Sequence, residues 1–198
     1  MLLYEKLAGK RLILGSKSPR RRELLAGCGL EFVTADSYEV DESYPAGLPA
    51  AEVPEFLARL KSDAYPVRLS DDEILVTADT VVVAGNEILG KPADRDAAIR
   101  MIGKLSGGRH TVVTGVAIRD GRRCESFSVG SDVWFRTLRP EEIEYYVDTY
   151  RPYDKAGAYG IQEWIGYVAV ERIEGSFYNV MGLPIQALYT RLERFLGA

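Results

Sequence analysis

The apolar run from Ile74 to Ala84 constrains the fold of this chain more than any other segment. Its many β-branched residues are typical of a central strand of a sheet. Asp79 lies in the middle of the run, and a carboxylate in so apolar a strand is costly unless a metal, a lysine or a hydrogen-bond donor compensates it. The sequence therefore predicts a central strand that carries one acidic side chain in need of a partner.

Asp79 has two interpretations, which the sequence leaves open. It is a metal ligand or general base, or it is a structural carboxylate on an exposed strand face or paired with an arginine. Two lysines are candidate partners for it. Lys61 lies at the edge of the apolar stripe of a helix, and Lys91 follows a hairpin that leaves the Asp79 strand. Either lysine can equally extend into solvent.

A second unusual feature lies at residues 16–22, where Ser-Lys-Ser-Pro is followed by three arginines. Ser18 is expected to cap a helix that has Pro19 at its first position. The first turn of a helix favours acidic residues by about 0.3–1 kcal/mol each, so arginines there break the rule. Free N–H groups, hydroxyls and guanidinium groups together suit an anion such as phosphate. The alternative is a solvated basic helix start that pairs with surface acids.

The remaining pattern predicts a mixed-sheet α/β protein, with a cleft between a parallel half and a hairpin-rich half. We expect helices on the faces of the sheet and one domain over residues 1–198. Strands are expected over residues 11–15, 31–35, 74–84 with a return strand to 89, 111–119, 124–137 and 164–173. Helices are expected over residues 19–27 or 19–29, 52–65, 97–105, 140–150 and 184–196.

Composition and charge exclude several classes of protein. The chain has 198 residues, of which 46% are hydrophobic and 27% charged, as in ordinary globular proteins. Its net charge of −4 provides no general basic field for nucleic acid. No stretch approaches about 18 uninterrupted apolar residues, so we expect no membrane span.

The few cysteines and histidines exclude further kinds of site. Cys28 and Cys124 lack CxxC spacing, so we expect neither a disulfide framework nor a thiolate zinc site, and a reducing cytoplasm fits best. His110 is the single histidine, which excludes multi-histidine metal sites. It lies at the entry to an apolar strand, and we expect it to be structural. There is no GxxxxGK[ST] P-loop and no GxGxxG after a strand.

Residues 154–162, Asp-Lys-Ala-Gly-Ala-Tyr-Gly-Ile-Gln, place small residues next to a polar end. Glycines permit close approach to a flat ligand, and Gln162 offers a donor and an acceptor to a base edge. A tight structural loop explains the segment equally well.

Six ordered segments, at residues 12–21, 78–82, 89–92, 110–115, 154–162 and 181–184, together resemble the Maf family of nucleoside triphosphate pyrophosphatases. The resemblance extends from about residue 11 to residue 196. It implies two lobes around a cleft, similar to inosine triphosphate pyrophosphatases, and usually a homodimer. The implied reaction is hydrolysis of a nucleoside triphosphate to the monophosphate and pyrophosphate with a divalent metal.

The resemblance also implies roles for individual residues. Ser16, Ser18, Arg20 and Arg21 match the phosphate-binding segment, Asp79 the proton acceptor, and Lys61 and Lys91 active-site lysines. Glu42 matches an acidic position, and we expect it to hold Mg²⁺ or Mn²⁺ together with Asp79. Gln162 and Thr80, with one of the arginines, match positions tied to base selection. The 154–162 loop resembles the subgroup that acts on dTTP and UTP. Two departures are Gly15, where Ala is more usual, and Glu163-Trp164, where many relatives have Gly.

Two rival functions stand beside hydrolysis of dTTP and UTP. In the first, the protein is a nucleotide-binding regulatory factor in cell division (septum formation) without significant turnover. In the second, it is a hydrolase whose main substrates are modified pyrimidine nucleotides. A nucleic-acid-binding role is weaker, because the basic cluster is one helix turn without interleaved aromatic residues.

Overall fold

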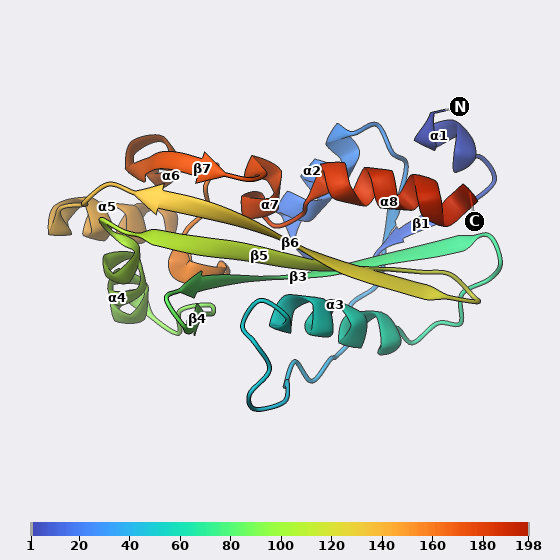
Figure 1. Ribbon diagram of the computed structural model, residues 1–198, viewed down its shortest axis with the longest axis horizontal. Coiled ribbons are helices and arrows are strands. Elements are labelled where there is room, and N and C mark those ends of the chain that lie inside the picture. Colours follow the sequence, from blue (N-terminus) through green and yellow to red (C-terminus); the bar gives the residue numbers. More distant parts are fainter. Residues whose placement is uncertain (1, 198) are drawn as a thin grey trace. The chain divides into compact units, whose positions relative to one another are not determined.

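The computed structural model describes residues 2–197, which contain a seven-stranded sheet (Figure 1). The strand order is β2-β1-β3-β5-β6-β7, and β4 pairs with β3. The strands are β1 Arg11–Leu14, β2 Val33–Thr34, β3 Glu73–Ala84, β4 Glu87–Leu89, β5 Arg109–Arg119, β6 Cys124–Phe135 and β7 Val170–Glu174.

The sheet contains both parallel and antiparallel pairs. β1 runs parallel to both β2 and β3, with Leu12 opposite Ile74 in the β1–β3 pair. β4 runs antiparallel to β3, and β7 runs antiparallel to β6 with Val133 opposite Ile173. Parallel strands require a crossover connection, and helices α2 (Pro19–Gly27) and α3 (Val53–Asp63) lie in the connections that join β1, β2 and β3. The predicted mixed α/β fold is confirmed.

The chain forms two compact units, and each is described by itself. Among the described residues, the first unit comprises residues 2–79, 114–129 and 182–197, and the second comprises residues 80–113 and 130–181. β3, β5 and β6 each contribute residues to both units. Asp79 is the last residue of its segment in the first unit.

Helices α3 and α8 of the first unit lie on opposite sides of its strands in Figure 1. Its helices are α1 Leu3–Lys6, α2 Pro19–Gly27, α3 Val53–Asp63 and α8 Ile185–Gly197. Gly115 on β5 allows the start of α3 to pack closely, since a Cβ there would lie 2.2 Å from the Pro54 and Glu55 backbone. On the other side, the Arg191 guanidinium of α8 lies 4.4 Å from the centre of the Phe127 ring on β6.

The second unit surrounds a buried aromatic cluster. The rings of His110, Phe135 and Tyr159 meet edge to face, with centroids 5.0 to 5.4 Å apart. An ion pair of 2.6 Å between Arg95 and Asp148 joins α4 to α5. The helices of this unit are α4 Arg95–Leu105, α5 Pro140–Tyr150, the 3₁₀ helix η1 Ala156–Ala158, α6 Trp164–Ala169 and α7 Phe177–Met181.

The strand that the sequence predicts over residues 164–173 is wrong in its first part. Residues 164–169 form α6, and β7 begins at Val170. Ile165 and Ala169, the buried residues of α6, lie four positions apart, which is helical spacing. The predicted strand over 31–35 is shorter, at Val33–Thr34, and α1 and α7 have no counterpart in the sequence-based prediction. The predicted start of α2 is confirmed, with Ser18 as its N-cap and Pro19 in its first turn.

Candidate active site

The turn from β1 into α2 carries two serines whose hydroxyls accept hydrogen bonds from its backbone. Ser16 Oγ accepts a hydrogen bond of 3.2 Å from the Ser18 backbone N–H, and Ser18 Oγ accepts one of 3.5 Å from the Arg21 N–H. Gly15 lets this turn lie close to β3, because a Cβ at this position would be 2.8 Å from Cγ2 of Thr77. The turn is therefore fixed beside the strand that carries Asp79.

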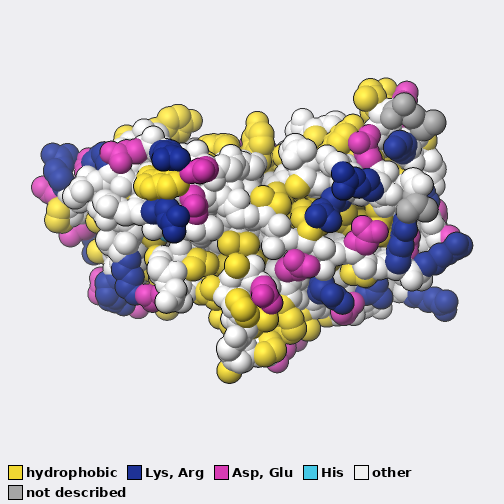
Figure 2. Space-filling view, viewed as in Figure 1, with side chains coloured by type: hydrophobic (Ala, Val, Ile, Leu, Met, Phe, Trp, Pro, Cys, Tyr) yellow, Lys and Arg dark blue, Asp and Glu magenta, His cyan; other side chains and the backbone are white. Residues whose placement is uncertain are grey.

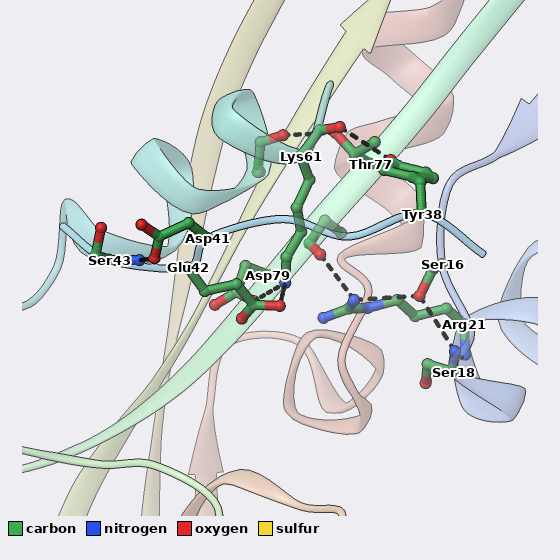
Figure 3. A network of polar contacts seen from close by, with 12 residues as sticks. Ser16, Ser18, Arg21, Tyr38, Asp41, Glu42, Ser43, Lys61, Thr77 and Asp79 are labelled. Atoms are coloured by element: carbon green, nitrogen blue, oxygen red, sulfur yellow. Dashed lines mark hydrogen bonds and ion pairs between the residues drawn. The ribbon is translucent and has the colours of Figure 1, made fainter. Parts of the chain in front are cut away.

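Arg21 connects this turn to two backbone segments (Figure 3). Its Nη1 donates to the Ala78 carbonyl at 2.7 Å and to Ser16 Oγ at 3.3 Å, and its Nε donates to the Gly182 carbonyl at 2.8 Å. Burial lowers the pKa of the Arg21 guanidinium, while the nearby charges of Asp79 and Glu42 act to raise it. Arg21 thus holds a positive charge next to the Asp79 carboxylate.

Asp79 has the partner that its strand requires, and that partner is a lysine. Lys61 Nζ on α3 lies 2.6 Å from Asp79 Oδ1 and 3.1 Å from Glu42 Oε1. The side chains of Lys61 and Asp79 are 16% and 13% exposed, whereas Glu42 is half exposed. Figure 3 shows Glu42 reaching this pair from the segment before α3. An ion pair at this depth offsets part of the cost of burying the carboxylate.

Tyr38 holds the segment that delivers Glu42. Its hydroxyl donates to the Lys61 carbonyl at 2.9 Å, and its ring meets Tyr65 edge to face. The sequence does not predict this role of Tyr38, because an isolated tyrosine in an irregular segment carries no signal of the contact.

The carboxylates of Asp79 and Glu42 lie close enough together to suit a divalent cation. Both approach a single point, which the Lys61 ammonium takes in this structure. Mg²⁺ is commonly held by one or two carboxylates, with substrate phosphates and water as the other ligands. Among residues 2–197, no group of three or more His, Cys, Asp or Glu side chains is placed to hold a metal ion. A cation at Asp79 and Glu42 would therefore need ligands from the substrate phosphates and water.

The structure brings together Ser16, Ser18, Arg21, Lys61, Glu42 and Asp79 in the first unit. Arg20 follows Pro19 at the start of α2, and its charge acts to lower the pKa of Arg21. The Asp79 strand, the arginine-rich turn at residues 16–22 and the family resemblance all pointed to residues of this group.

Thr80, Lys91 and Gln162 belong to the second unit. The Gly157 N–H donates to the Gly90 carbonyl at 3.0 Å, so the segment that ends in Lys91 is joined to the loop that leads to Gln162. Gly157 has a φ of +68°, and a Cβ there would lie 2.9 Å from a methyl of Val82. This glycine is required by the close approach of the loop to β3.

The Gln162 side chain has an unusual acceptor. Its Oε1 is buried and has no hydrogen-bond partner among the described residues. An unpaired buried acceptor costs about 1–3 kcal/mol, so it favours a donor brought by a ligand. The amide of Gln162 is thus suited to receive an N–H group.

His110 is structural, as expected. Its Nε2 lies 2.7 Å from the Tyr159 hydroxyl and it is 1% exposed. Burial is the main cause that lowers its pKa to about 4. A neutral, buried imidazole that hydrogen-bonds a buried tyrosine is not arranged as the base of a Ser/His/Asp hydrolase.

On the face that Figure 2 shows, Lys and Arg side chains are interspersed with Asp and Glu side chains. No helix within residues 2–197 has the length and apolar character that a membrane crossing needs.

Comparison with known proteins identifies the family. A family model described as "Maf-like protein" matches residues 11–195. A Porphyromonas gingivalis protein named dTTP/UTP pyrophosphatase is 51% identical over 195 residues, covering 98% of each chain. A Bacteroides thetaiotaomicron protein of the same name is 52% identical over 184 residues, covering 93% of this chain and 95% of that one.

A solved structure with a similar fold is that of the Staphylococcus aureus Ham1 protein. Its TM-score is 0.55 at 15% identity, and the match covers 94% of this chain and 100% of that one. At this identity the likeness concerns the fold alone. The family model spans nearly the whole sequence, and about half of the positions are identical in full-length relatives. The chain therefore belongs to the Maf family.

Proposed function

We propose that this protein hydrolyses dTTP and UTP to the nucleoside monophosphate and pyrophosphate. The observation that carries the proposal is the 2.6 Å pair of Lys61 and Asp79 beside the turn that Arg21 fixes. Membership of the Maf family and relatives named dTTP/UTP pyrophosphatase support it.

The triphosphate binds at the turn between β1 and α2 in this proposal. The hydroxyls of Ser16 and Ser18 hold phosphate oxygens in place, and the positive end of the α2 dipole favours their charge. The N–H groups expected to be free for this purpose are bonded within the turn, that of Ser18 to Ser16 Oγ and that of Arg21 to Ser18 Oγ. The guanidinium groups of Arg20 and Arg21 and the ammonium groups of Lys61 and Lys91 neutralise the charge that grows on the leaving pyrophosphate.

Asp79 acts as the proton acceptor. A water molecule attacks the α-phosphorus, its oxygen forms a new P–O bond, and the bond from the α-phosphorus to the bridging oxygen breaks. Pyrophosphate leaves with that electron pair, and the proton from the water passes to the Asp79 carboxylate. Lys61 releases Asp79 for this step by moving its ammonium towards the incoming phosphates, which carry more negative charge than one carboxylate.

Asp79 and Glu42 are the residues that hold Mg²⁺ or Mn²⁺ when the triphosphate is bound. Such an ion neutralises phosphate charge and makes a bound water more acidic. The convergence of the two carboxylates on one point supports this assignment.

Gln162 and Thr80 select the base. Thymine and uracil present carbonyl oxygens next to an N3–H, and one amide pairs with a carbonyl and that N–H at once. The unpaired Oε1 of Gln162 supplies the acceptor for N3–H. Cytosine has an acceptor at N3 and mismatches unless the amide flips.

The test is a hydrolysis screen of natural and modified nucleoside triphosphates, with and without divalent metal, in which both products are identified. Monophosphate and pyrophosphate from dTTP and UTP are expected, with ¹⁸O from labelled water in the monophosphate. Tight nucleotide binding without pyrophosphate release would favour the regulatory factor in cell division. Faster turnover of a modified pyrimidine than of dTTP and UTP would make that compound the true substrate.

We also propose that residues 1–198 act as one domain, in a cytoplasmic homodimer. The two thiols, Cys28 and Cys124, are free in the structure, as a reducing compartment requires. Light scattering at micromolar concentration measures the mass, and a monomer would contradict the homodimer. Fractionation of cells tests the location.

A further inference from the structure

The hydroxyl of Tyr146 on α5 closes the turn that carries Gln162. It accepts a hydrogen bond of 3.0 Å from the Gly160 backbone N–H, and it donates to the carboxylate oxygen Oε2 of Glu163. The Glu163 N–H also donates to the Gly160 carbonyl at 3.0 Å. The turn from residue 160 to residue 163 is therefore closed twice, once through the backbone and once through a buried tyrosine.

A lysine secures the other oxygen of the same carboxylate. Lys155 Nζ lies 3.1 Å from Glu163 Oε1, and its side chain is 10% exposed. Burial and the Glu163 carboxylate both raise the pKa of Tyr146, so its hydroxyl stays protonated and acts as the donor to Glu163. Every oxygen of this network thus has a defined partner.

Gln162 lies within the turn that this network closes. Its amide nitrogen comes so close to the Gly160 backbone that a Cβ at position 160 would lie 3.0 Å from it. The closed turn limits how the amide can rotate, while its Oε1 has no partner among residues 2–197. An amide that is free to flip presents either hydrogen-bond pattern and accepts uracil and cytosine alike. Discrimination between the two bases requires an amide whose orientation is held.

We propose that Glu163, held by Tyr146 and Lys155, is a positioning residue that fixes the Gln162 amide for a base with an N3–H. The network then sets the preference for uracil and thymine over cytosine. This inference rests on the proposed function, in which Gln162 reads the base. The bases contact Gln162, and Tyr146 and Glu163 act through it.

The test compares kcat/KM for UTP with kcat/KM for CTP, two substrates with the same triphosphate and ribose. Tyr146→Phe keeps the ring but removes the bridging oxygen, and Glu163→Ala removes the carboxylate. Both are expected to lower the UTP-to-CTP ratio about tenfold, the effect of losing roughly one hydrogen bond's worth of discrimination. Glu163→Gln keeps the acceptor for Tyr146 and is expected to retain most of the preference.

Tyr145→Phe is the matched control, because it removes a hydroxyl from a half-exposed ring one position earlier on α5. It is expected to leave the ratio at the wild-type value. A loss of stability alone lowers kcat/KM for both nucleotides equally, so it does not move the ratio. If Glu163→Ala fails to fold because Lys155 is left without this partner, Tyr146→Phe decides the question.

The outcomes separate this inference from the proposed function. Tyr146→Phe with a wild-type ratio overturns the inference and leaves base reading by Gln162 intact. A wild-type protein without preference for UTP over CTP overturns base reading itself, and the inference with it. Amide exchange at Gly160 gives a readout independent of turnover, since Tyr146→Phe is expected to speed it, and unchanged exchange contradicts the closed turn.

Discussion

Lys61 Nζ and Asp79 Oδ1 lie 2.6 Å apart, and this pair joins helix α3 to the middle of the apolar strand β3. The lysine also contacts Glu42 at 3.1 Å, so one ammonium serves two carboxylates. Few other positions in so apolar a strand tolerate a charge, because the cost of burial has to be met by a partner. Changes to this pair are therefore expected to affect the proposed reaction directly.

Asp79→Asn is expected to lower kcat for pyrophosphate release about 10²- to 10⁴-fold, the usual effect of losing a general base. The amide has nearly the same shape as the carboxylate, and Lys61 keeps Glu42 as a partner. Asp71→Asn is the control, since it breaks an exposed pair with Arg122 and is expected to keep full activity. Near-normal release by Asp79→Asn would remove Asp79 from the mechanism.

Arg21→Lys is expected to destabilise the fold by about 1–3 kcal/mol and to lower kcat/KM. A lysine keeps the charge but cannot bond the carbonyls of Ala78 and Gly182 together with Ser16, so buried acceptors lose their donors. Urea denaturation and steady-state kinetics measure the two effects. Arg22→Lys, at an exposed position on the same helix, is the control. Equal stability of the two variants would contradict the anchoring role of Arg21.

Glu42→Gln is expected to raise the Mg²⁺ concentration needed for half-maximal activity about tenfold, because one of two carboxylate ligands loses its charge. Titration of the chelator-treated enzyme with Mg²⁺ measures this shift, and Glu39→Gln on the same exposed segment is the control. Full activity after removal of divalent ions would contradict the metal site.

Gln162→Leu is expected to reduce the ratio of kcat/KM for UTP to that for CTP at least about tenfold, because a site that hydrogen-bonds its substrate discriminates through those bonds. The control is Gln186→Leu, at an exposed position on α8. A ratio that stays at the wild-type value in Gln162→Leu assigns base selection to other residues.

His110 predicts a specific loss of stability in acid. Burial lowers its pKa in the folded protein to about 4, whereas the unfolded chain takes up the proton near about 6.5. The unfolded state therefore binds more protons between these values, and folding stability falls as the pH decreases through this window. Relative to His110→Gln, the wild type is expected to lose about 2–3 kcal/mol between pH 7 and pH 4.5. Parallel curves of unfolding free energy against pH would contradict this.

The start of α2 is an element that the local sequence predicts correctly. Ser18 and Pro19 mark the first turn of that helix in the sequence, and the structure begins it there. The local sequence does not predict the helix at residues 164–169, because a short apolar stretch is compatible with a strand or a helix. Packing against the rest of the protein determines which of its residues are buried. Ile165 and Ala169 are buried together in a helix, and no capping residue announces it.

The sequence by itself determined that a buried Asp79 needs a compensating partner and that the arginine-rich turn suits an anion, since both follow from the cost of charge in a given local setting. It left two lysines as possible partners for Asp79. Only the tertiary structure paired Asp79 with Lys61, fixed Arg21 on the carbonyls of Ala78 and Gly182, and closed the turn that carries Gln162 through Tyr146. These contacts join residues far apart in the chain, and several end on backbone atoms that every residue carries, so residue type alone gives no sign of them.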